Sequence, residues 1–144
     1  MKKSIANARW EKGLKDGSGK LTTRNGSLDA SYSFATRFEE GKAGTTPEEL
    51  IGAAHAGCYS MFLSALLGNK NLTPDYIQTE ARVYLGEKDG APLITKIELT
   101  TEAQVPDLSE EEFQQLVQQA KEGCPVSKAL SAVPEITVQA TLKG

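Results

Sequence analysis

Two cysteines are the residues of this chain best suited to redox or nucleophilic chemistry, and they lie far apart in the sequence. Cys124 precedes Pro125, which suits the first position of a helix, so Cys124 is expected at the N-cap. There the backbone N–H groups and the helix dipole favour a thiolate. Cys58 lies among small residues in the middle of a predicted helix and needs a separate cation to become nucleophilic. The pair is typical of an attacking thiol and a resolving thiol.

Two other interpretations of the cysteines stay open. Each could be a buried cysteine that packs as a small apolar residue. A structural disulfide would close a loop of about 66 residues and would stabilise the fold by about 4 kcal/mol. However, residues 1–20 contain no apolar segment after Met-Lys-Lys, so no secretory signal is expected and a reducing, cytoplasmic compartment is favoured.

The single histidine, His55, lies three residues before Cys58 and on the same helical face. This spacing suggests a Cys-His dyad or a zinc site with His55, Cys58 and Cys124 as ligands beside a carboxylate. No closely paired cysteine motif supports zinc, and no oxyanion loop supports a Cys-His hydrolase. We therefore predict no metal and interpret His55 as a hydrogen-bonded packing residue.

Arg37 and Glu48 are the charged candidates. Arg37 lies alone on the small-residue face of a strand predicted over residues 31–39, and Glu48 opens the next helix together with Glu49. Acidic side chains suit a helix N-terminus because of the dipole, which explains Glu49 without any function. For Arg37, a solvated charge on a strand explains the sequence as well as a functional role does.

The longest predicted element is a central helix within residues 45–69. Thr46 suits the N-cap, Pro47 suits the first helical position, and Glu49 completes a capping box. No Asp, Glu, Lys or Arg lies between Glu49 and Lys70, and a helix of about 22 residues is about 33 Å long. Because it is apolar or small on every face, we predict that it runs through the middle of the protein.

The composition limits the classes of function. The chain has 144 residues, of which 39% are hydrophobic, and a net charge of −3, which suits one domain with a lean core. Lysine and arginine form no long run, so nucleic-acid binding is not expected. Glycine, serine and histidine dilute the hydrophobicity of the central helix, so we expect that helix to be buried in protein and not in a membrane.

Periodicity predicts a single α+β domain made of two antiparallel units with helical cover. Residues 1–44 hold strands, residues 45–69 hold the central helix, and residues 75–144 form a unit of strands and helices. The predicted strands cover residues 4–10, 20–24, 31–39, 79–87, 93–105 and 135–142. The further predicted helices are 110–123, which begins with a capping box of Ser109 and Glu112, and a short one from Pro125 to Ala132. Apolar residues share one face of the strand 93–105 and one face of the helix 110–123; they are Ile97, Leu99, Ala103 and Val105 on the strand and Phe113, Leu116, Val117 and Ala120 on the helix.

Three segments carry a resemblance to a known family. They are Thr36-Arg37-Phe38, the stretch TTPEELIGAAHAGCYSMFLSALL from Thr45, and KEGCPVSKAL from Lys121. With these segments and this order of elements, the chain resembles the OsmC/Ohr family of osmotically inducible and organic hydroperoxide resistance proteins over essentially its whole length. The segment HAGCYS is more similar to the OsmC branch than to Ohr.

The resemblance implies a cysteine-based peroxidase that reduces organic hydroperoxides, and hydrogen peroxide more slowly, without a metal or cofactor. By motif position, Cys58 corresponds to the peroxidatic cysteine and Cys124 to the resolving one. Arg37 corresponds to the activating arginine, and Glu48 to the glutamate that holds it. Thr46 stands where the family often has asparagine, and it should cap the helix equally well.

The same resemblance implies an intertwined homodimer, in which antiparallel sheets wrap around long central helices, and an external dithiol reductant such as a lipoyl group. Glu48 and Cys58 are ten residues apart, about 15 Å along one helix, so Arg37 cannot easily reach both. We therefore predict that each site is built from two subunits whose central helices cross antiparallel near Ala53, where the surrounding residues are small: Gly52, Ala53, Ala54, Ala56 and Gly57. The alternative is a kink at Gly52 or Gly57, which would keep the site within one chain. The alternative class is a non-enzymatic stress protein of the same fold that binds a lipid or another small molecule in its apolar interior.

Overall fold

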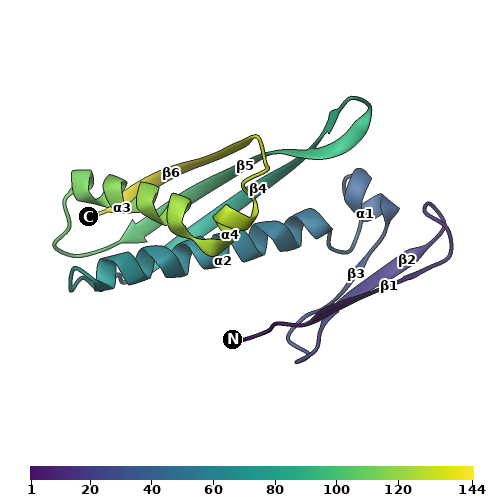
Figure 1. The fold of residues 1–144 in the computed structure, drawn as a ribbon, viewed down its shortest axis with the longest axis horizontal. Helices are drawn as coiled ribbons and strands as arrows, with labels where there is room; N and C mark the ends of the chain where they lie inside the picture. The colour runs from purple at the N-terminus through teal and green to yellow at the C-terminus, as the bar shows by residue number, and fades with distance from the viewer. The chain divides into compact units, whose positions relative to one another are not determined.

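The computed structural model describes residues 1–144 and divides them into two compact units, Met1–Leu50 and Ile51–Gly144. Each unit contains one three-stranded sheet (Figure 1). The helix α2, Pro47–Gly68, starts in the first unit and continues as the longest helix of the second. This mixture of separate sheets and helices confirms the α+β class.

The first unit begins with an antiparallel sheet of β1 Ala6–Glu11, β2 Ser18–Thr23 and β3 Asp29–Tyr32. The chain turns between β2 and β3 at Asn25-Gly26, a dipeptide that is typical of hairpin turns. Gly26 has a φ of 79°, a left-handed conformation that glycine adopts without strain. The Asn25 side chain accepts a backbone N–H two residues further on, at 3.0 Å, and closes the turn.

The strand predicted over residues 31–39 is wrong for its second half. Ser33 instead caps a short helix, α1 Phe34–Phe38. Its hydroxyl accepts the backbone N–H of Thr36 at 3.1 Å, and the Thr36 hydroxyl accepts the backbone N–H of Ser33 at 2.8 Å. These side-chain bonds to the backbone outweigh the strand-like alternation of the aromatic residues. Arg37 therefore lies in the last turn of a helix and not on a strand.

The start of α2 agrees with the predicted cap in part. The Thr46 side chain accepts the backbone N–H of Glu49 at 2.9 Å, which is one half of a capping box. The Glu49 carboxylate accepts the hydroxyl of Thr45 at 3.0 Å instead of closing the box. Pro47 is the first helical residue, as predicted. In the first turn of α2, the Thr46 side chain thus satisfies the backbone donor of Glu49.

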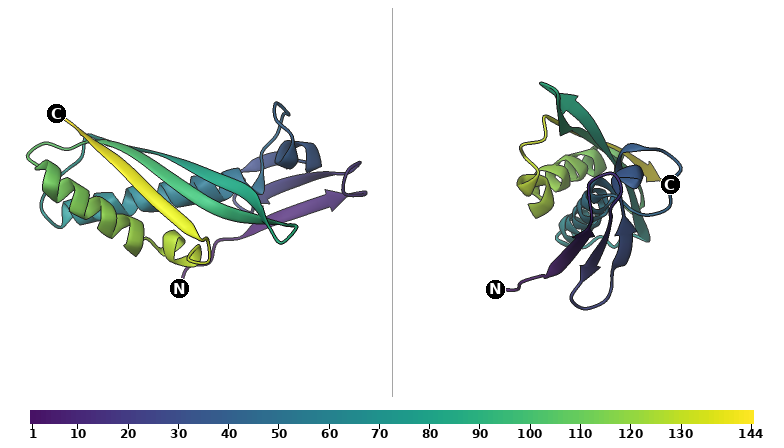
Figure 2. Two further views of the ribbon diagram at one scale, coloured as in Figure 1. Left: turned by 90° about the horizontal axis from the view of Figure 1, so that it is seen from above. Right: turned by 90° about the vertical axis from the view of Figure 1, so that its right-hand side faces the viewer.

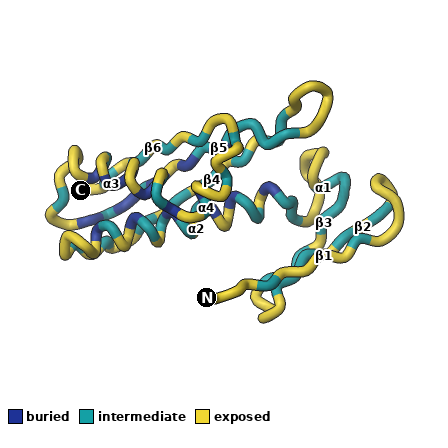
Figure 3. Tube along the Cα trace, in the orientation of Figure 1, coloured by how far each residue is buried: buried dark blue, intermediate teal, exposed yellow.

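α2 is buried along one stripe and not on every face, which corrects the prediction (Figure 3). The buried residues recur every three or four positions, as on one face of a helix; they are Glu48, Gly52, His55, Tyr59, Leu63 and Leu67. Beyond Glu49, which is exposed in the first turn, the opposite side is exposed and uncharged. We call it the open face of α2, and it consists of Ala53, Ala54, Gly57, Met61, Ser64 and Ala65.

α2 is long and apolar enough to cross a membrane by length and composition alone. Core helices of folded proteins meet the same criterion, and part of α2 packs into the hydrophobic core of the second unit. A Cβ placed on Gly52 would lie 3.4 Å from Val83 and 3.6 Å from the Ala81 side chain of the neighbouring strand. We therefore keep the interpretation of α2 as a core helix.

The second unit is built on a sheet of β4 Tyr76–Lys88, β5 Ala91–Gln104 and β6 Glu135–Lys143, with β5 in the centre. β4 and β5 form an antiparallel hairpin, but β6 runs parallel to β5. The prediction of a fully antiparallel unit is therefore wrong for β6. The reason is the helical crossover between β5 and β6. It carries the chain back to the end of the sheet where β5 begins, so β6 starts there and runs parallel to β5.

The crossover consists of α3 Glu110–Gly123 and α4 Pro125–Ala129. α3 begins after Ser109, whose hydroxyl accepts the backbone N–H of Glu112 at 3.2 Å, which is one half of the predicted capping box. α4 ends before the predicted boundary at Ala132. A single residue, Cys124, connects α3 to α4, and it is the N-cap of α4.

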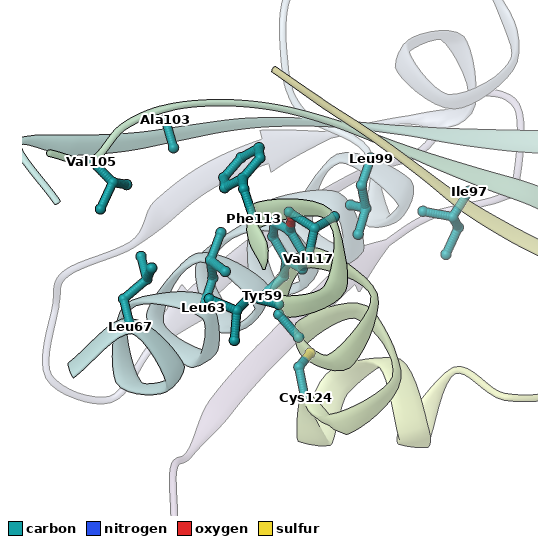
Figure 4. Close-up of a cluster of buried hydrophobic side chains, with 12 residues drawn as sticks. Tyr59, Leu63, Leu67, Ile97, Leu99, Ala103, Val105, Phe113, Val117 and Cys124 are labelled. Atoms are coloured by element: carbon teal, nitrogen blue, oxygen red, sulfur yellow. The ribbon is translucent and has the colours of Figure 1, made fainter. Parts of the chain in front are cut away.

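α2 and α3 lie on the same face of the β4–β5–β6 sheet (Figure 2). Their apolar side chains meet those of β5 in one core (Figure 4), which includes Tyr59, Leu63, Ile97, Leu99, Phe113, Val117 and Cys124. The alternation on β5 and the helical spacing on α3 predicted the inward positions of these two elements correctly. The core holds α2 and the start of α4 at fixed positions in the second unit.

Candidate active site

Cys58 of α2 and Cys124 lie next to each other in the second unit. Both are free thiols; Cys124 is fully buried and Cys58 is half-buried. Cys58 packs against the buried core that contains Cys124, and each thiol shifts the pKa of the other. The packing of α2 against the start of α4 thus joins two cysteines that are far apart in the sequence.

Cys124 is the N-cap of α4, as predicted, and Pro125 is the first helical residue. The backbone N–H of Ser127 donates a hydrogen bond to Cys124 Sγ at 3.3 Å. Burial raises the pKa of the Cys124 thiol, but hydrogen bonds, above all those with Ser127, lower it more, so the pKa lies below the ordinary value. The N-cap therefore favours a thiolate at Cys124.

Cys58 has the opposite environment. Burial raises the pKa of its thiol, the backbone of Val126 lowers it through a hydrogen bond, and the neighbouring Cys124 raises it. The pKa of Cys58 consequently lies above the ordinary value, and no cationic side chain contributes to it. Activation of Cys58 therefore needs a cation, as expected for a thiol in the middle of a helix.

Arg37 and Glu48 form an ion pair in the first unit. Arg37 Nε and Nη2 both donate to Glu48 Oε1, at 2.9 Å and 2.7 Å. The Glu48 side chain is only 9% exposed, whereas that of Arg37 is 38% exposed. The glutamate is thus the fixed partner, and the guanidinium reaches solvent. This contact places Glu48 where it can orient Arg37; the catalytic roles of both residues stay predictions.

An apolar hollow surrounds Arg37. It has a volume of about 250 Å³ and is lined by Trp10, Leu14, Tyr32, Ser33, Phe34, Arg37 and Phe38. The Phe34 and Phe38 rings are one helical turn apart, with centroids at 4.8 Å, and the guanidinium carbon of Arg37 lies 5.5 Å from the centre of the Phe38 ring. The hollow combines an aromatic wall with one exposed cation, which suits a molecule that has an apolar tail and a polar head.

His55 is fully buried in the second unit, and its Nε2 lies 2.7 Å from Ser127 Oγ. This hydrogen bond confirms the interpretation of His55 as a hydrogen-bonded packing residue. Burial lowers the pKa of its imidazole. No group of three or more His, Cys, Asp or Glu side chains in the chain could hold a metal ion.

Ser127 is a site residue that sequence reasoning missed. It is buried, it bonds to His55, and its hydroxyl lies 3.4 Å from Cys124 Sγ. The signal was present in the segment GCPVS, because a residue three positions after an N-cap donates its backbone N–H to the capping side chain. The partner His55 could not be inferred in this way, since it lies on another helix.

Comparison with known proteins supports these observations. The family model for OsmC-like protein matches residues 39–139. The chain is 49% identical over 137 residues to the peroxiredoxin OsmC of Escherichia coli (strain K12), with 94% of each chain covered. It is 34% identical over 112 residues to the organic hydroperoxide resistance protein OhrB of Bacillus subtilis (strain 168), with 77% of this chain and 80% of the relative covered.

Solved structures agree with the fold. The crystal structure of OhrB of Bacillus subtilis superposes with a TM-score of 0.70 at 30% identity and covers 96% of this chain and 98% of its own. An OsmC-like protein from Mycoplasma pneumoniae gives a TM-score of 0.78 at 20% identity, with 99% of both chains covered, and shows the likeness of fold. From the matching family model and these relatives, the chain belongs to the OsmC-like protein family.

Proposed function

We propose that this protein is a thiol-dependent peroxidase that reduces organic hydroperoxides through Cys58 and Cys124. The observation that carries the proposal is the adjacency of two free thiols of unequal exposure and opposite pKa shifts. Relatives named peroxiredoxin OsmC and organic hydroperoxide resistance protein support the same class of reaction.

The exposure of the two cysteines supports Cys58 as the first to react. Cys124 is fully buried, so a peroxide from solvent meets the half-buried Cys58 first. The Cys58 thiolate attacks one peroxide oxygen, the O–O bond breaks, and the alkoxide leaves and takes up a proton to become an alcohol. Cys58 is now a sulfenic acid. Cys124 attacks its sulfur, the S–O bond breaks, water leaves and a disulfide forms.

Arg37 would supply the missing activation of Cys58. An unperturbed thiol with a pKa of about 8.5 is only about 3% thiolate at neutral pH, and lowering the pKa to about 6 gains about 30-fold. A fast peroxidase needs more than this gain. Arg37, held by Glu48 and exposed to solvent, would therefore also bind the peroxide oxygens and stabilise the charge that develops as the O–O bond breaks.

The disulfide would be reset by an external dithiol, with a lipoyl group as the favoured chemistry. A dithiol attacks the disulfide, forms a mixed disulfide and leaves as a cyclic disulfide, so two electrons return to the cysteines. The open face of α2 supports a homodimer as the working form. It is exposed, uncharged and continuous over several turns, and a second copy of the same helix would cover it.

A thiol count tests the proposal directly. Reduced protein should lose both titratable thiols per chain after one equivalent of cumene hydroperoxide, because one turnover oxidises Cys58 and Cys124 together. The count is made under denaturing conditions with a thiol reagent, and peptide mass spectrometry locates the disulfide. A protein that binds the hydroperoxide but keeps both thiols would instead be the non-enzymatic binding module, with the hollow beside Arg37 as its site.

We expect a preference for organic hydroperoxides over hydrogen peroxide. Although Tyr59 follows Cys58 directly in the sequence, it does not contribute to this preference, because its side chain is fully buried in the core and bonds to Thr101. The apolar wall is instead that of the hollow, formed in part by Phe34 and Phe38 beside Arg37. Each buried CH₂ of a substrate contributes up to about 0.8 kcal/mol, so kcat/KM for cumene hydroperoxide should exceed that for hydrogen peroxide by at least about tenfold.

The measurement is kcat/KM for both peroxides in the wild type and in Phe34→Ala. The variant should lower the value for cumene hydroperoxide and leave that for hydrogen peroxide unchanged. Tyr84→Ala is the matched control, since it removes an exposed aromatic side chain that does not line the hollow. Equal values for the two peroxides in the wild type would show that the aromatic wall serves packing only.

A further inference from the structure

Three buried side chains form a continuous chain of hydrogen bonds behind the resolving cysteine. Cys124 Sγ lies 3.4 Å from Ser127 Oγ, which lies 2.7 Å from His55 Nε2. Cys124 and His55 are fully buried, and Ser127 is 8% exposed. The chain therefore runs from a reactive sulfur to an imidazole without entering solvent.

The local structure fixes the middle of this chain. Ser127 lies in the first turn of α4, three residues after the cap, and its backbone N–H donates to Cys124 Sγ at 3.3 Å. This bond holds the sulfur beside the Ser127 hydroxyl. His55 approaches the same hydroxyl from the buried stripe of α2. Two helices are thus needed to assemble the three groups.

The second ring nitrogen of His55 distinguishes this histidine from one that only fills space. Nδ1 is buried and has no hydrogen-bond partner in the protein. A buried polar atom without a partner is costly and calls for an explanation such as a catalytic role. Because nothing fixes the tautomer through Nδ1, Nε2 is free either to accept a proton or to donate one to Ser127.

We infer that Ser127 and His55 relay the proton of the Cys124 thiol when Cys124 attacks the sulfenic acid on Cys58. This inference rests on the proposed peroxidase function. Ser127, which contacts the reacting sulfur, is the catalytic residue of the relay. His55 acts through Ser127 and is the positioning residue that holds the proton.

The step balances without any added reagent. The Cys124 thiol proton passes to Ser127 Oγ while the Ser127 hydroxyl proton passes to His55 Nε2. The Cys124 sulfur then bonds to the Cys58 sulfur, the S–O bond of the sulfenic acid breaks, and hydroxide leaves. The proton held on His55 returns through Ser127 to neutralise the hydroxide, so the products are one disulfide and one water.

The surroundings of His55 suit a temporary proton acceptor. Burial lowers the pKa of its imidazole, and no charged side chain contributes to that pKa. The imidazole is therefore neutral before the step and gives the proton back readily after it. The titratable groups nearest to it along the relay are the two thiols, Cys58 on α2 and Cys124 at the cap of α4.

The test separates the two half-reactions in a single turnover. Reduced protein is mixed with one equivalent of cumene hydroperoxide, the sulfenic acid on Cys58 is followed by dimedone trapping, and the Cys58–Cys124 disulfide is followed by peptide mass spectrometry. Ser127→Val and Ser127→Thr have side chains of nearly equal size and differ in the hydroxyl. The relay predicts that Ser127→Val forms the disulfide about 10²-fold more slowly, that Ser127→Thr stays near the wild type, and that sulfenic acid forms at the same rate in both.

His55→Gln is the variant that tests proton transfer at His55. Glutamine still offers an amide to the Ser127 hydroxyl but cannot hold a proton at neutral pH. Disulfide formation should slow by about 10²-fold, and the part of its pH profile that reports the imidazole should disappear. Thr101→Val is the control, since it removes a buried hydroxyl that bonds only to Tyr59 at 3.0 Å; its disulfide rate should stay unchanged.

Two results would overturn the relay. One is a wild-type disulfide rate with a wild-type pH profile in His55→Gln. The other is an equal rate of disulfide formation in Ser127→Val and Ser127→Thr. This second comparison remains valid even if His55→Gln fails to fold. A wild type that forms neither sulfenic acid nor disulfide would contradict the proposed function itself, and this outcome differs from both.

Discussion

Replacing Cys58 with serine is expected to abolish consumption of cumene hydroperoxide, whereas Cys124→Ser should still permit one turnover. Cys58 is the half-buried thiol that a peroxide can meet, and Cys124 is fully buried. In Cys124→Ser, the sulfenic acid on Cys58 has no thiol partner and should persist. The measurements are peroxide consumed per chain without reductant, expected at about one equivalent in Cys124→Ser, and dimedone labelling of Cys58.

The pKa shifts make this experiment decisive. Within the second unit Cys124 has the lowered pKa and Cys58 the raised one, so thiolate content alone would name Cys124 as the attacking residue. That rival assignment predicts the reverse pattern, with Cys124→Ser inert and Cys58→Ser completing one turnover. A Cys58→Ser protein that consumes peroxide at the wild-type rate would remove Cys58 from the reaction altogether.

The sequence predicted those parts of the fold in which the pattern of apolar residues within a single helix or strand is sufficient. The alternation on β5 and the spacing on α3 identified buried residues correctly, because burial of one face repeats with the period of the element. The pattern misled at α1, where Ser33 and Thr36 bond to the backbone and form a helix. The direction of β6 was also missed, since it depends on the crossover through α3 and α4.

In the candidate site, too, local features could be predicted from the sequence and contacts between helices could not. The N-cap position of Cys124 follows from the proline after it, and the structure has it there. Contacts between helices carry no local signal: His55 and Ser127 come together only because α2 packs against the start of α4. The resemblance to the family paired Glu48 with Arg37, and the two form an ion pair in the structure.

The small residues of α2 lie on different faces of the helix. The sequence grouped Gly52 with Ala53, Ala54 and Gly57 as a surface where two helices could cross. Gly52 instead lies on the buried stripe against β4, where a Cβ would meet Val83 at 3.4 Å. A Cβ at Gly57 would meet nothing within 4 Å. Gly57 and the alanines therefore remain on the open face, available to a second copy of the chain.

The second prediction with a large expected effect is that each active site is divided between two subunits. Glu48 and Cys58 lie on one continuous helix, α2, and ten residues along a helix span about 15 Å. An antiparallel crossing of two α2 helices near Ala53 would bring Glu48 of one subunit level with Cys58 of the other. Arg37 would then follow Glu48, because the two form an ion pair.

Mixed dimers test this arrangement. Cys58→Ser and Glu48→Ala are each expected to be inactive alone. When the two are unfolded and refolded together in equal amounts, about half of the dimers should be mixed, and each mixed dimer should contain one intact site. About a quarter of the wild-type activity should therefore return. The readout is peroxide consumption with a dithiol reductant, with the mixed dimers identified by different affinity tags.

A second mixture serves as the matched control. Cys58 and Cys124 lie together within the second unit of one chain, so refolding Cys58→Ser with Cys124→Ser should return no more peroxide consumption than the two variants show when each is refolded alone. Every chain of that mixture lacks one of the two thiols that must meet, whichever partner it has. Recovery in the first mixture and none in the second would assign Glu48 and Cys58 of each site to different subunits. No recovery in the first, with mixed dimers present, would assign them to the same subunit.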